Sequence, residues 1–416
     1  RHTRYISVTG VQTCALPISN SNVATHIFDK LVDQDEQQKL KPGLATEWKT
    51  LDDTTWEFKL RRGVKFHDGS DFTAEDVAAT LKRVPWVPNS PSPFTLYMRH
   101  ITGVEIVDPY TIRFKTAQPF PLMATYLSTI FIVSKKHEQS ATGEFNAGRA
   151  AVGTGPFRFA EYVPGDRVVV QRNDGYWGDK PQWQKVTFKL ITNNSSRVAA
   201  LLAGDVQVIE QVPATDYSKL KTNANVSLSQ IVGNRVIYLH VDSFRDQTPF
   251  ATDKAGAVLP NNPLKDVRVR RALSKAINRA AISERIMEGL AIPAGGVLAE
   301  GFFGSSPKLK PDAMDPEGAK KLLTEAGYPN GFGLTIHGPS DRYLNDEKVL
   351  QAIGPMFNRI GVDTKVVTLP WATFASQGSA PNYAYSLMLV GWGAGMLSAS
   401  QPGVQSVLDN PASALG

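Results

Sequence analysis

One arginine of this 416-residue chain lies where a strand should give way to a helix. Residues 332–337 predict a strand and residues 345–360 predict a helix, so Arg342 falls in the loop between them. A planar guanidinium suits a carboxylate, which it can bind through two parallel hydrogen bonds. Ligands favour the crevice beyond the carboxyl ends of strands. Arg342 is therefore a candidate carboxylate anchor, and the alternative is an exposed arginine that begins a helix.

A second candidate lies at the end of the apolar run 383–390, which predicts a strand covered on both faces. Gly391, Trp392 and Gly393 close this run. An indole at a strand end can pack against a bound solute, since it combines a large apolar surface with one hydrogen-bond donor. The alternative for Trp392 is ordinary core packing.

The sequence lacks the usual signatures of catalysis and of metal binding. It has no Gly-x-Ser-x-Gly motif, and its histidines do not pair at the spacing of a metal-binding helix. His67 and Asp68 are adjacent, which favours turn chemistry over an acid–base pair. Residues 153–157 read Gly-Thr-Gly-Pro-Phe, without the lysine of a phosphate-binding loop. We therefore expect no catalytic residues, no metal site and no cofactor.

Composition narrows the class of protein. The length predicts two or three domains, and 42% hydrophobic with 20% charged residues is ordinary for a globular protein. The net charge of +6 is spread along the chain, so we expect no nucleic-acid partner. No run approaches the roughly 18 apolar residues of a membrane span.

The first nineteen residues need separate treatment. Val8 to Ile18 read VTGVQTCALPI, which resembles the translation of a sequencing-library adapter. Polar residues and a proline interrupt the apolar core that a signal peptide would need. Setting residues 1–19 aside as a non-native leader removes Cys14, the single cysteine, and leaves a net charge of +4 because Arg1 and Arg4 go with it. A chain without cysteine fits an oxidising compartment.

The stretch from Trp48 to Arg83 has the densest local signals. Apolar and charged residues alternate over 55–61, which predicts a half-buried antiparallel strand. Thr73 should cap a helix, with Asp76 three residues later completing a capping box. Residues 104–115 predict a hairpin.

The same stretch resembles a known family. Its pattern W-x-x-x-x-D-x-T-W-E-F-K-L-R-x-G-V-K-F-H-D-G-x-x-F-T-A-E-D-V is similar to the fingerprint of the extracytoplasmic solute-binding proteins of family 5, the peptide/nickel type that serves ABC importers. The segments LKDVRVRRALSKAINR and DPEGAKKLLTEAGYPNGF, and Tyr176-Trp177-Gly178, carry the likeness further. The resemblance covers essentially all of residues 20–400.

The resemblance implies an α/β fold of the type 2 periplasmic-binding-protein class: a two-lobed clamshell with an extra small subdomain, here truncated at both ends. Composition favours a boundary at residues 246–263. We assign residues 20–47 and 150–255 to a first lobe, 48–149 to the inserted subdomain and 256–416 to a second lobe. We expect the strand before residue 20 and the closing segment to be missing.

The resemblance also bears on the site. Dipeptide-binding members hold the ligand carboxylate with an arginine in a similar Arg-x-x-Asn context, which matches Arg342-Tyr343-Leu344-Asn345. A Gly-Trp pair occurs at the corresponding place, so Arg342, Tyr343, Gly391, Trp392 and Gly393 form the predicted substrate site. Peptide binders usually follow that pair with an acidic residue, but residues 393–396 carry no carboxylate. This departure favours an amino-blocked peptide, a sugar or another organic solute over a free peptide, and a nickel chelate stays open.

The implied function is the substrate-binding component of an ABC importer. It would be a periplasmic monomer without catalytic activity, whose signal peptide is missing from this chain. It would close on a peptide-like or other small organic solute and deliver it to a membrane permease in peptide transport. The alternatives are a ligand sensor or periplasmic chaperone on the same fold, or a two-lobed hydrolase.

Overall fold

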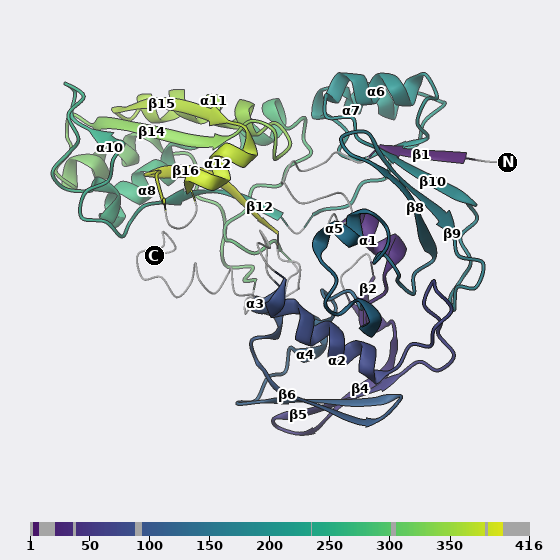
Figure 1. Cartoon of the computed structure of the whole chain (residues 1–416). Helices are drawn as coiled ribbons and strands as arrows, with labels where there is room; N and C mark the ends of the chain where they lie inside the picture. The colour runs from purple at the N-terminus through teal and green to yellow at the C-terminus, as the bar shows by residue number, and fades with distance from the viewer. Residues whose placement is uncertain are drawn as a thin grey trace. The chain divides into compact units, whose positions relative to one another are not determined.

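In the computed structural model the chain divides into two compact units, and the division in the sequence falls between Gln211 and Val212. This division falls before residues 246–263, where composition placed a boundary, and the assignment of lobes and of an inserted subdomain stays a prediction. The structure describes residues 3–7, 21–35, 39–87, 94–233, 235–300, 305–378 and 382–393 (Figure 1).

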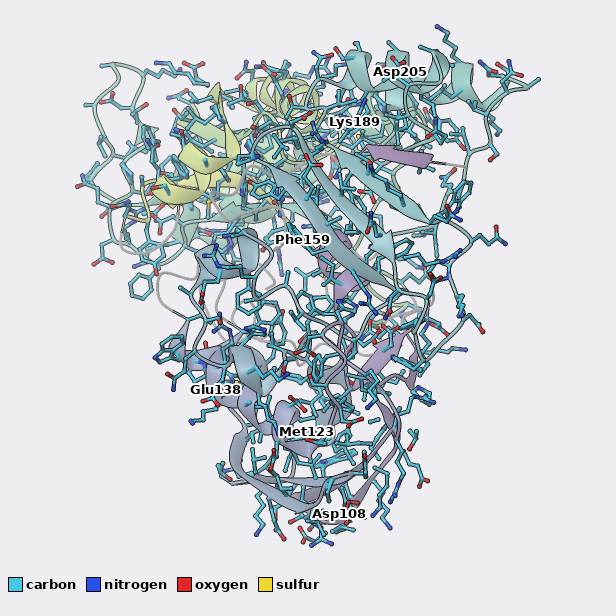
Figure 2. The ribbon with its side chains drawn as sticks, turned by 45° about the vertical axis from the view of Figure 1, so that its right-hand side comes forward. Asp108, Met123, Glu138, Phe159, Lys189 and Asp205 are labelled. Atoms are coloured by element: carbon cyan, nitrogen blue, oxygen red, sulfur yellow. The ribbon has the colours of Figure 1, made fainter. Side chains whose placement is uncertain are left out.

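Unit 1 contains a four-stranded antiparallel sheet in the order β4-β5-β7-β6, formed by β4 (Ala45–Asp52), β5 (Thr55–Leu60), β7 (Thr111–Thr116) and β6 (Ile101–Asp108). Phe58 and Leu60 are buried and Lys59 is exposed, as the predicted alternation requires. Glu57, one of the alternating charged residues, departs from it: its side chain is buried and paired with Arg113 at 2.9 Å. The predicted hairpin is β6 and β7, and Asp108, labelled in Figure 2, ends the first of these strands.

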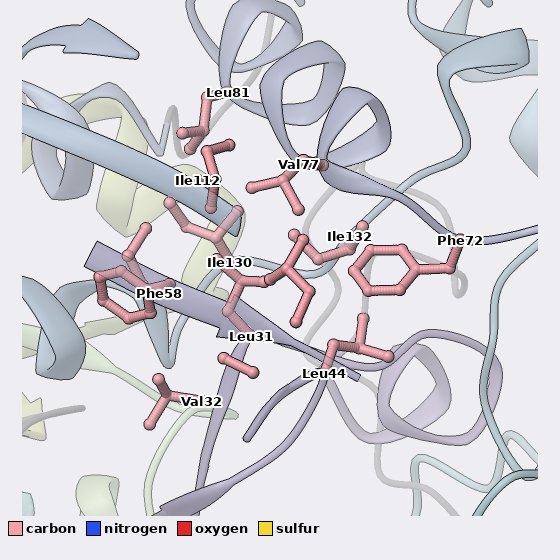
Figure 3. Packing of buried hydrophobic residues seen from close by; sticks show 14 of the residues in the cluster. Leu31, Val32, Leu44, Phe58, Phe72, Val77, Leu81, Ile112, Ile130 and Ile132 are labelled. Atoms are coloured by element: carbon pink, nitrogen blue, oxygen red, sulfur yellow. The ribbon is translucent and has the colours of Figure 1, made fainter. Parts of the chain in front are cut away.

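The helix α2 (Ala74–Arg83) covers this sheet and begins as predicted. Asp76 accepts the backbone N–H of Thr73 at 2.9 Å, the reciprocal half of a capping box. Its other oxygen accepts the N–H of Lys135 at 2.8 Å and so ties the helix to a later segment. Val77 and Leu81 of α2 enter an apolar core with Phe58 of the sheet, Leu31 and other buried residues (Figure 3).

A five-stranded sheet in the order β11-β1-β10-β9-β8 completes unit 1. Its strand β1 (Thr3–Ser7) pairs in parallel with β10 (Lys185–Lys189) and β11 (Val208–Ile209). This corrects the expectation that no strand precedes the first helix, α1 (Ser21–Ile27). Strand pairing uses backbone N–H and C=O groups, which nearly any sequence supplies, so a segment set aside on its letters can still occupy a strand position. Whether the leader is foreign stays a prediction.

Unit 2 is built on a mixed sheet in the order β12-β16-β14-β13, with β15 also pairing with β14. The strands β14, β15 and β16 run parallel, and β12 runs antiparallel to β16. The strand predicted over residues 383–390 begins later, at Leu387, so Tyr385 and Ser386 lie before it. The bounds are β12 (Arg235–Val241), β13 (Ala251–Thr252), β14 (Phe332–Pro339), β15 (Val362–Leu369) and β16 (Leu387–Gly393).

The helices of unit 2 pack on this sheet around a core that includes Leu264, Leu334 and Phe357. The helix ends were largely predictable: Asp315 caps α10 by accepting the N–H of Gly318 at 2.8 Å, and Gly361 has a φ of 94° just beyond α11. The bounds are α8 (Val267–Ala276), α10 (Pro316–Glu325), α11 (Asp346–Asn358) and α12 (Trp371–Gly378).

In the described ranges, no helix has the length and apolarity needed to cross a membrane. The five-stranded sheet also contains β8 (Phe157–Val163) and β9 (Arg167–Arg172), and β2 (Val32–Gln34) pairs with β3 (Leu40–Pro42). The other α-helices are α3 (Thr95–Met98), α4 (Met123–Leu127), α5 (Thr142–Asn146), α6 (Asn194–Leu202), α7 (Ala214–Lys221) and α9 (Arg279–Ala281).

Candidate functional site

The loop between β14 and α11, residues 340–345, holds the candidate site in unit 2. Asp341 accepts the backbone N–H of Trp371 at 2.7 Å and ties the loop to the start of α12. Asn345 takes a left-handed backbone conformation with a φ of 54°, and its side chain donates to the carbonyl of Ile286 at 2.7 Å. Asn and Asp tolerate this conformation better than most residues. Both ends of the loop are therefore held in place by side-chain bonds.

The buried carboxylate of Asp346 holds the backbone of the loop through hydrogen bonds. One of its oxygens accepts the backbone N–H groups of Arg342 and Tyr343, both at 2.9 Å, and the other accepts that of Glu347 at 2.9 Å. Burial raises the pKa of Asp346, and these hydrogen bonds oppose the rise. At the first turn of α11 the helix dipole also favours a negative charge. This carboxylate fixes the backbone of Arg342, and three backbone donors already engage it.

The side chain of Arg342 is half-buried against aromatic rings. Its guanidinium carbon lies 4.7 Å from the ring centroid of Trp371 and 5.9 Å from that of Tyr343. Its Nε is buried and has no hydrogen-bond partner among the described residues. A buried polar group left unpaired costs about 1–3 kcal/mol. No carboxylate in the described part of the chain forms an ion pair with it, so Arg342 is a cation with donors to offer to an anion.

A second arginine, Arg235, adjoins the same ring and was not foreseen. Its guanidinium carbon lies 5.8 Å from the centroid of Tyr343, and its Nη1 donates to the carbonyl of Gly391 at 3.1 Å. The side chain remains exposed, but the protein packed around the guanidinium and the charge of Arg342 lower the pKa of Arg235. Its position at the start of a strand was readable from sequence. The pairing of β12 with β16 was not, and this pairing brings Arg235 to the site.

Gly391 lets the side chains of Tyr343 and Arg235 approach the backbone of β16 closely. The hydroxyl of Tyr343 donates to the carbonyl of Gly391 at 3.3 Å. A Cβ at Gly391 would lie 2.5 Å from Cδ1 of Ile237 and 2.7 Å from Cε1 of Tyr343, both closer than real contacts allow. A side chain at this position would have to displace the end of Ile237 and the ring of Tyr343, so the packing favours glycine.

The predicted site residues are thus placed as follows. Arg342 and Gly391 both contact Tyr343, and the role of these three residues in binding stays a prediction. Trp392 and Gly393 lie in β16, where their backbones pair with Val236 and Arg235. The side chain of Trp392 lies outside what the structure describes, as do residues 394–396, so its role at the site stays a prediction.

The adjacent residues His67 and Asp68 each have hydrogen-bond or ion-pair partners within the protein. His67 uses both ring nitrogens, one against the carbonyl of Gly155 at 3.0 Å and one against the N–H of Gly153 at 3.3 Å. Burial lowers its pKa to about 4. The neighbouring Asp68 pairs with Lys136 at 2.6 Å and accepts the hydroxyl of Ser70 at 2.6 Å. In the ranges that are described, no group of three or more His, Cys, Asp or Glu residues could hold a metal ion.

The fold and the comparison with known families define the class of protein. The model of the bacterial extracellular solute-binding proteins, family 5, matches residues 39–411. The chain belongs to this family, and its α/β fold is that of the type 2 periplasmic binding proteins, as expected.

The chain is 32% identical over 354 residues to the glutathione-binding protein GsiB of Escherichia coli K12, an alignment that covers 83% of this chain and 64% of that protein. The same values hold for GsiB of Salmonella choleraesuis. The chain therefore spans less than two thirds of the length of these curated relatives.

Solved structures agree on the fold. The periplasmic binding protein DppA of Helicobacter pylori, in complex with the peptide STSA, superposes with a TM-score of 0.79 at 24% identity, covering 99% of this chain and 82% of that one. AgaA of A. tumefaciens R10, in complex with agropinic acid, gives a TM-score of 0.74 at 26% identity, covering 96% and 78%.

Proposed function

We propose that this protein is the substrate-binding component of an ABC importer. It captures a peptide-like or other small organic solute between two lobes and delivers it to a membrane permease. It acts outside the cytoplasm as a monomer, performs no chemistry and binds no nucleic acid. Family membership supports the class of function. The predicted lobes are residues 20–47 with 150–255, and residues 256–416, with 48–149 inserted. We move their boundary back to Val212, because β12 and β13 pair into the sheet of unit 2.

One observation carries the proposal: Arg342 lies on the rings of Trp371 and Tyr343 without a carboxylate partner among the described residues. A stacked guanidinium is held in a fixed orientation, which suits the planar recognition of a carboxylate. Glutathione, named in the E. coli relative, is the first candidate solute. Peptides and agropinic acid, present in complexes of structural neighbours, come next.

A thermal-shift screen tests this function. The library holds glutathione, free and amino-blocked peptides, opines, sugars and nickel chelates. A ligand at one hundred times its dissociation constant stabilises the folded state by about 2.7 kcal/mol, which raises the melting temperature by a few degrees. We expect a hit among the carboxylates that is lost in Arg342→Gln.

The matched control is Arg359→Gln, which removes an exposed arginine at the end of α11. It should bind the solute as the unaltered protein does. Uptake of the labelled solute in a cell that lacks the native gene then separates transport from sensing. If binding persists in Arg342→Gln, Arg342 is not the carboxylate anchor. If the folded protein binds no member of the library, the proposed receptor function is wrong.

A further inference from the structure

Two cations share one aromatic ring in unit 2. The guanidinium carbons of Arg235 and Arg342 lie 5.8 Å and 5.9 Å from the ring centroid of Tyr343. They are therefore separated by at most the sum of these distances, about 12 Å. The two residues come from different strands, β12 and the loop after β14. Like charges so placed repel each other unless an anion compensates them.

The protein supplies no such anion from its described residues. Neither arginine forms an ion pair there, and Asp346, at the start of α11, is occupied by three backbone N–H groups. Asp341 is turned to the backbone of Trp371. Within the described part of the chain, the carbonyl of Gly391 is the one hydrogen-bond partner of the Arg235 side chain. A guanidinium has five donors, so most of them stay open to a ligand.

We propose that Arg235 and Arg342 each bind one anionic group of the same solute, so that the protein selects small organic solutes carrying two carboxylates. This inference rests on the proposed function. An extended chain spans about 3.3–3.6 Å per residue, so a solute of two or three residues reaches about 7–11 Å, within the limit set by the two guanidinium groups.

The surroundings favour two separate contacts over one shared group. Arg342 lies against Trp371 and Tyr343, and Arg235 is bonded to the backbone of β16. Each fork is thus held by its own neighbours, and neither needs the other to be oriented. The influence of Arg342 on the pKa of Arg235 agrees with an uncompensated positive pair. Bound carboxylates would reverse that influence.

Calorimetric titration with matched solutes tests the proposal. The probes are glutathione, which has two carboxylates, and two derivatives in which one or the other carboxylate is a neutral amide. We expect the protein to bind glutathione about 10- to 100-fold more tightly than either amide, the range for losing one charge-assisted hydrogen bond. Arg235→Gln should weaken glutathione binding by a similar factor and leave the affinity for one of the amides unchanged.

Arg342→Gln should show the same pattern for the other amide. Arg235→Lys, which keeps the charge but loses the fork, should recover part of the affinity. Arg359→Gln is again the control, and circular dichroism verifies that each variant is folded. If Arg235→Gln weakens the diacid and both amides equally, or weakens none, the two-point site is wrong while the receptor function stands.

Other outcomes separate the two proposals. If the protein binds only solutes with one charge or none, the dianion selectivity is overturned and the receptor function is kept. If the folded protein binds no probe and no member of the screening library, the proposed function fails and takes the inference with it.

Discussion

Two polar clusters of this protein differ in how far the protein itself satisfies them. In unit 1, Asp29 accepts the hydroxyl of Thr154 at 2.9 Å, the indole N–H of Trp177 at 2.8 Å and the hydroxyl of Tyr176 at 3.3 Å. In unit 2, Arg235 and Arg342 adjoin Tyr343 without a carboxylate among the described residues. Both clusters place charge beside aromatic rings.

The difference separates a structural role in unit 1 from the binding role that we propose in unit 2. Burial raises the pKa of Asp29, while three donors stabilise its charged form and oppose that rise. Its neighbours Thr154 and Gly153 pack against the first helix, where a Cβ on Gly153 would lie 1.9 Å from the carbonyl oxygen of Ile27. A satisfied charge consolidates the fold, whereas an unsatisfied cation on a fixed support is open to a ligand.

The largest expected effect is on stability at the satisfied cluster. Asp29→Ala should lower the free energy of unfolding by about 3–4 kcal/mol, because it strips three donors of their acceptor and Thr154 is fully buried. Urea unfolding measures the loss, and hydrogen exchange should locate it in unit 1. The control Asp53→Ala removes an exposed turn residue and should change little. If Asp29→Ala and Asp53→Ala lowered the free energy of unfolding equally, the structural role of the Asp29 cluster would be wrong.

A pH effect of intermediate size is expected in unit 2. His337 is 5% exposed and stacks on Tyr385 at a centroid distance of 4.4 Å. Burial lowers its pKa to about 4, below the unfolded value near 6.5. The unfolded state therefore binds the proton first, so stability is complete above pH 6.5 and falls as the pH drops toward 4.

The size of this loss follows from linkage. Between pH 6.5 and pH 5, His337 should contribute about 2 kcal/mol of destabilisation. His337→Phe should flatten this part of the pH profile in urea unfolding, with unit 2 followed by hydrogen exchange. A matched change at His137, which hydrogen-bonds Ser140 in unit 1, should leave the profile of unit 2 alone. An unaltered profile in His337→Phe would assign the acid sensitivity elsewhere.

A smaller effect is expected beneath the candidate site. Asp346→Ala should cost about 1–2 kcal/mol, since three backbone N–H groups at the start of α11 lose their acceptor. The same change should weaken solute binding, because it frees the backbone of Arg342. Asp346→Asn keeps an acceptor and should lose less of both. A variant that unfolds more easily but binds unchanged would show that the loop is positioned without this carboxylate.

The smallest effect on stability is expected at the unsatisfied cluster. Arg235→Gln should change the free energy of unfolding by less than about 0.5 kcal/mol, as most exposed substitutions do, although it weakens the binding of a diacid. Thermal melts without ligand measure this. A large loss of stability without ligand would make Arg235 a structural residue and would remove the contrast with Asp29.

Local features of this protein were predictable from sequence. The alternation around Phe58, the cap formed by Asp76, the helix closed by Gly361 and the position of Arg342 after a strand depend on residues close together in the chain. Propensity, capping and hydrophobic period act over that range. The family was also readable, because its pattern is contiguous between Trp48 and Arg83.

Tertiary structure alone decided the rest. Arg235 and Gly391 are far apart in sequence and meet because β12 pairs with β16 in one register, which places Ile237 opposite Gly391. A shift of one residue would turn each side chain to the other face of the sheet. The strand Thr3–Ser7 is likewise positioned by backbone pairing with β10, which its sequence pattern did not predict. The sequence determined the elements and the position of Arg342 after a strand. The register of distant strands decided that a second cation, Arg235, adjoins the same tyrosine ring.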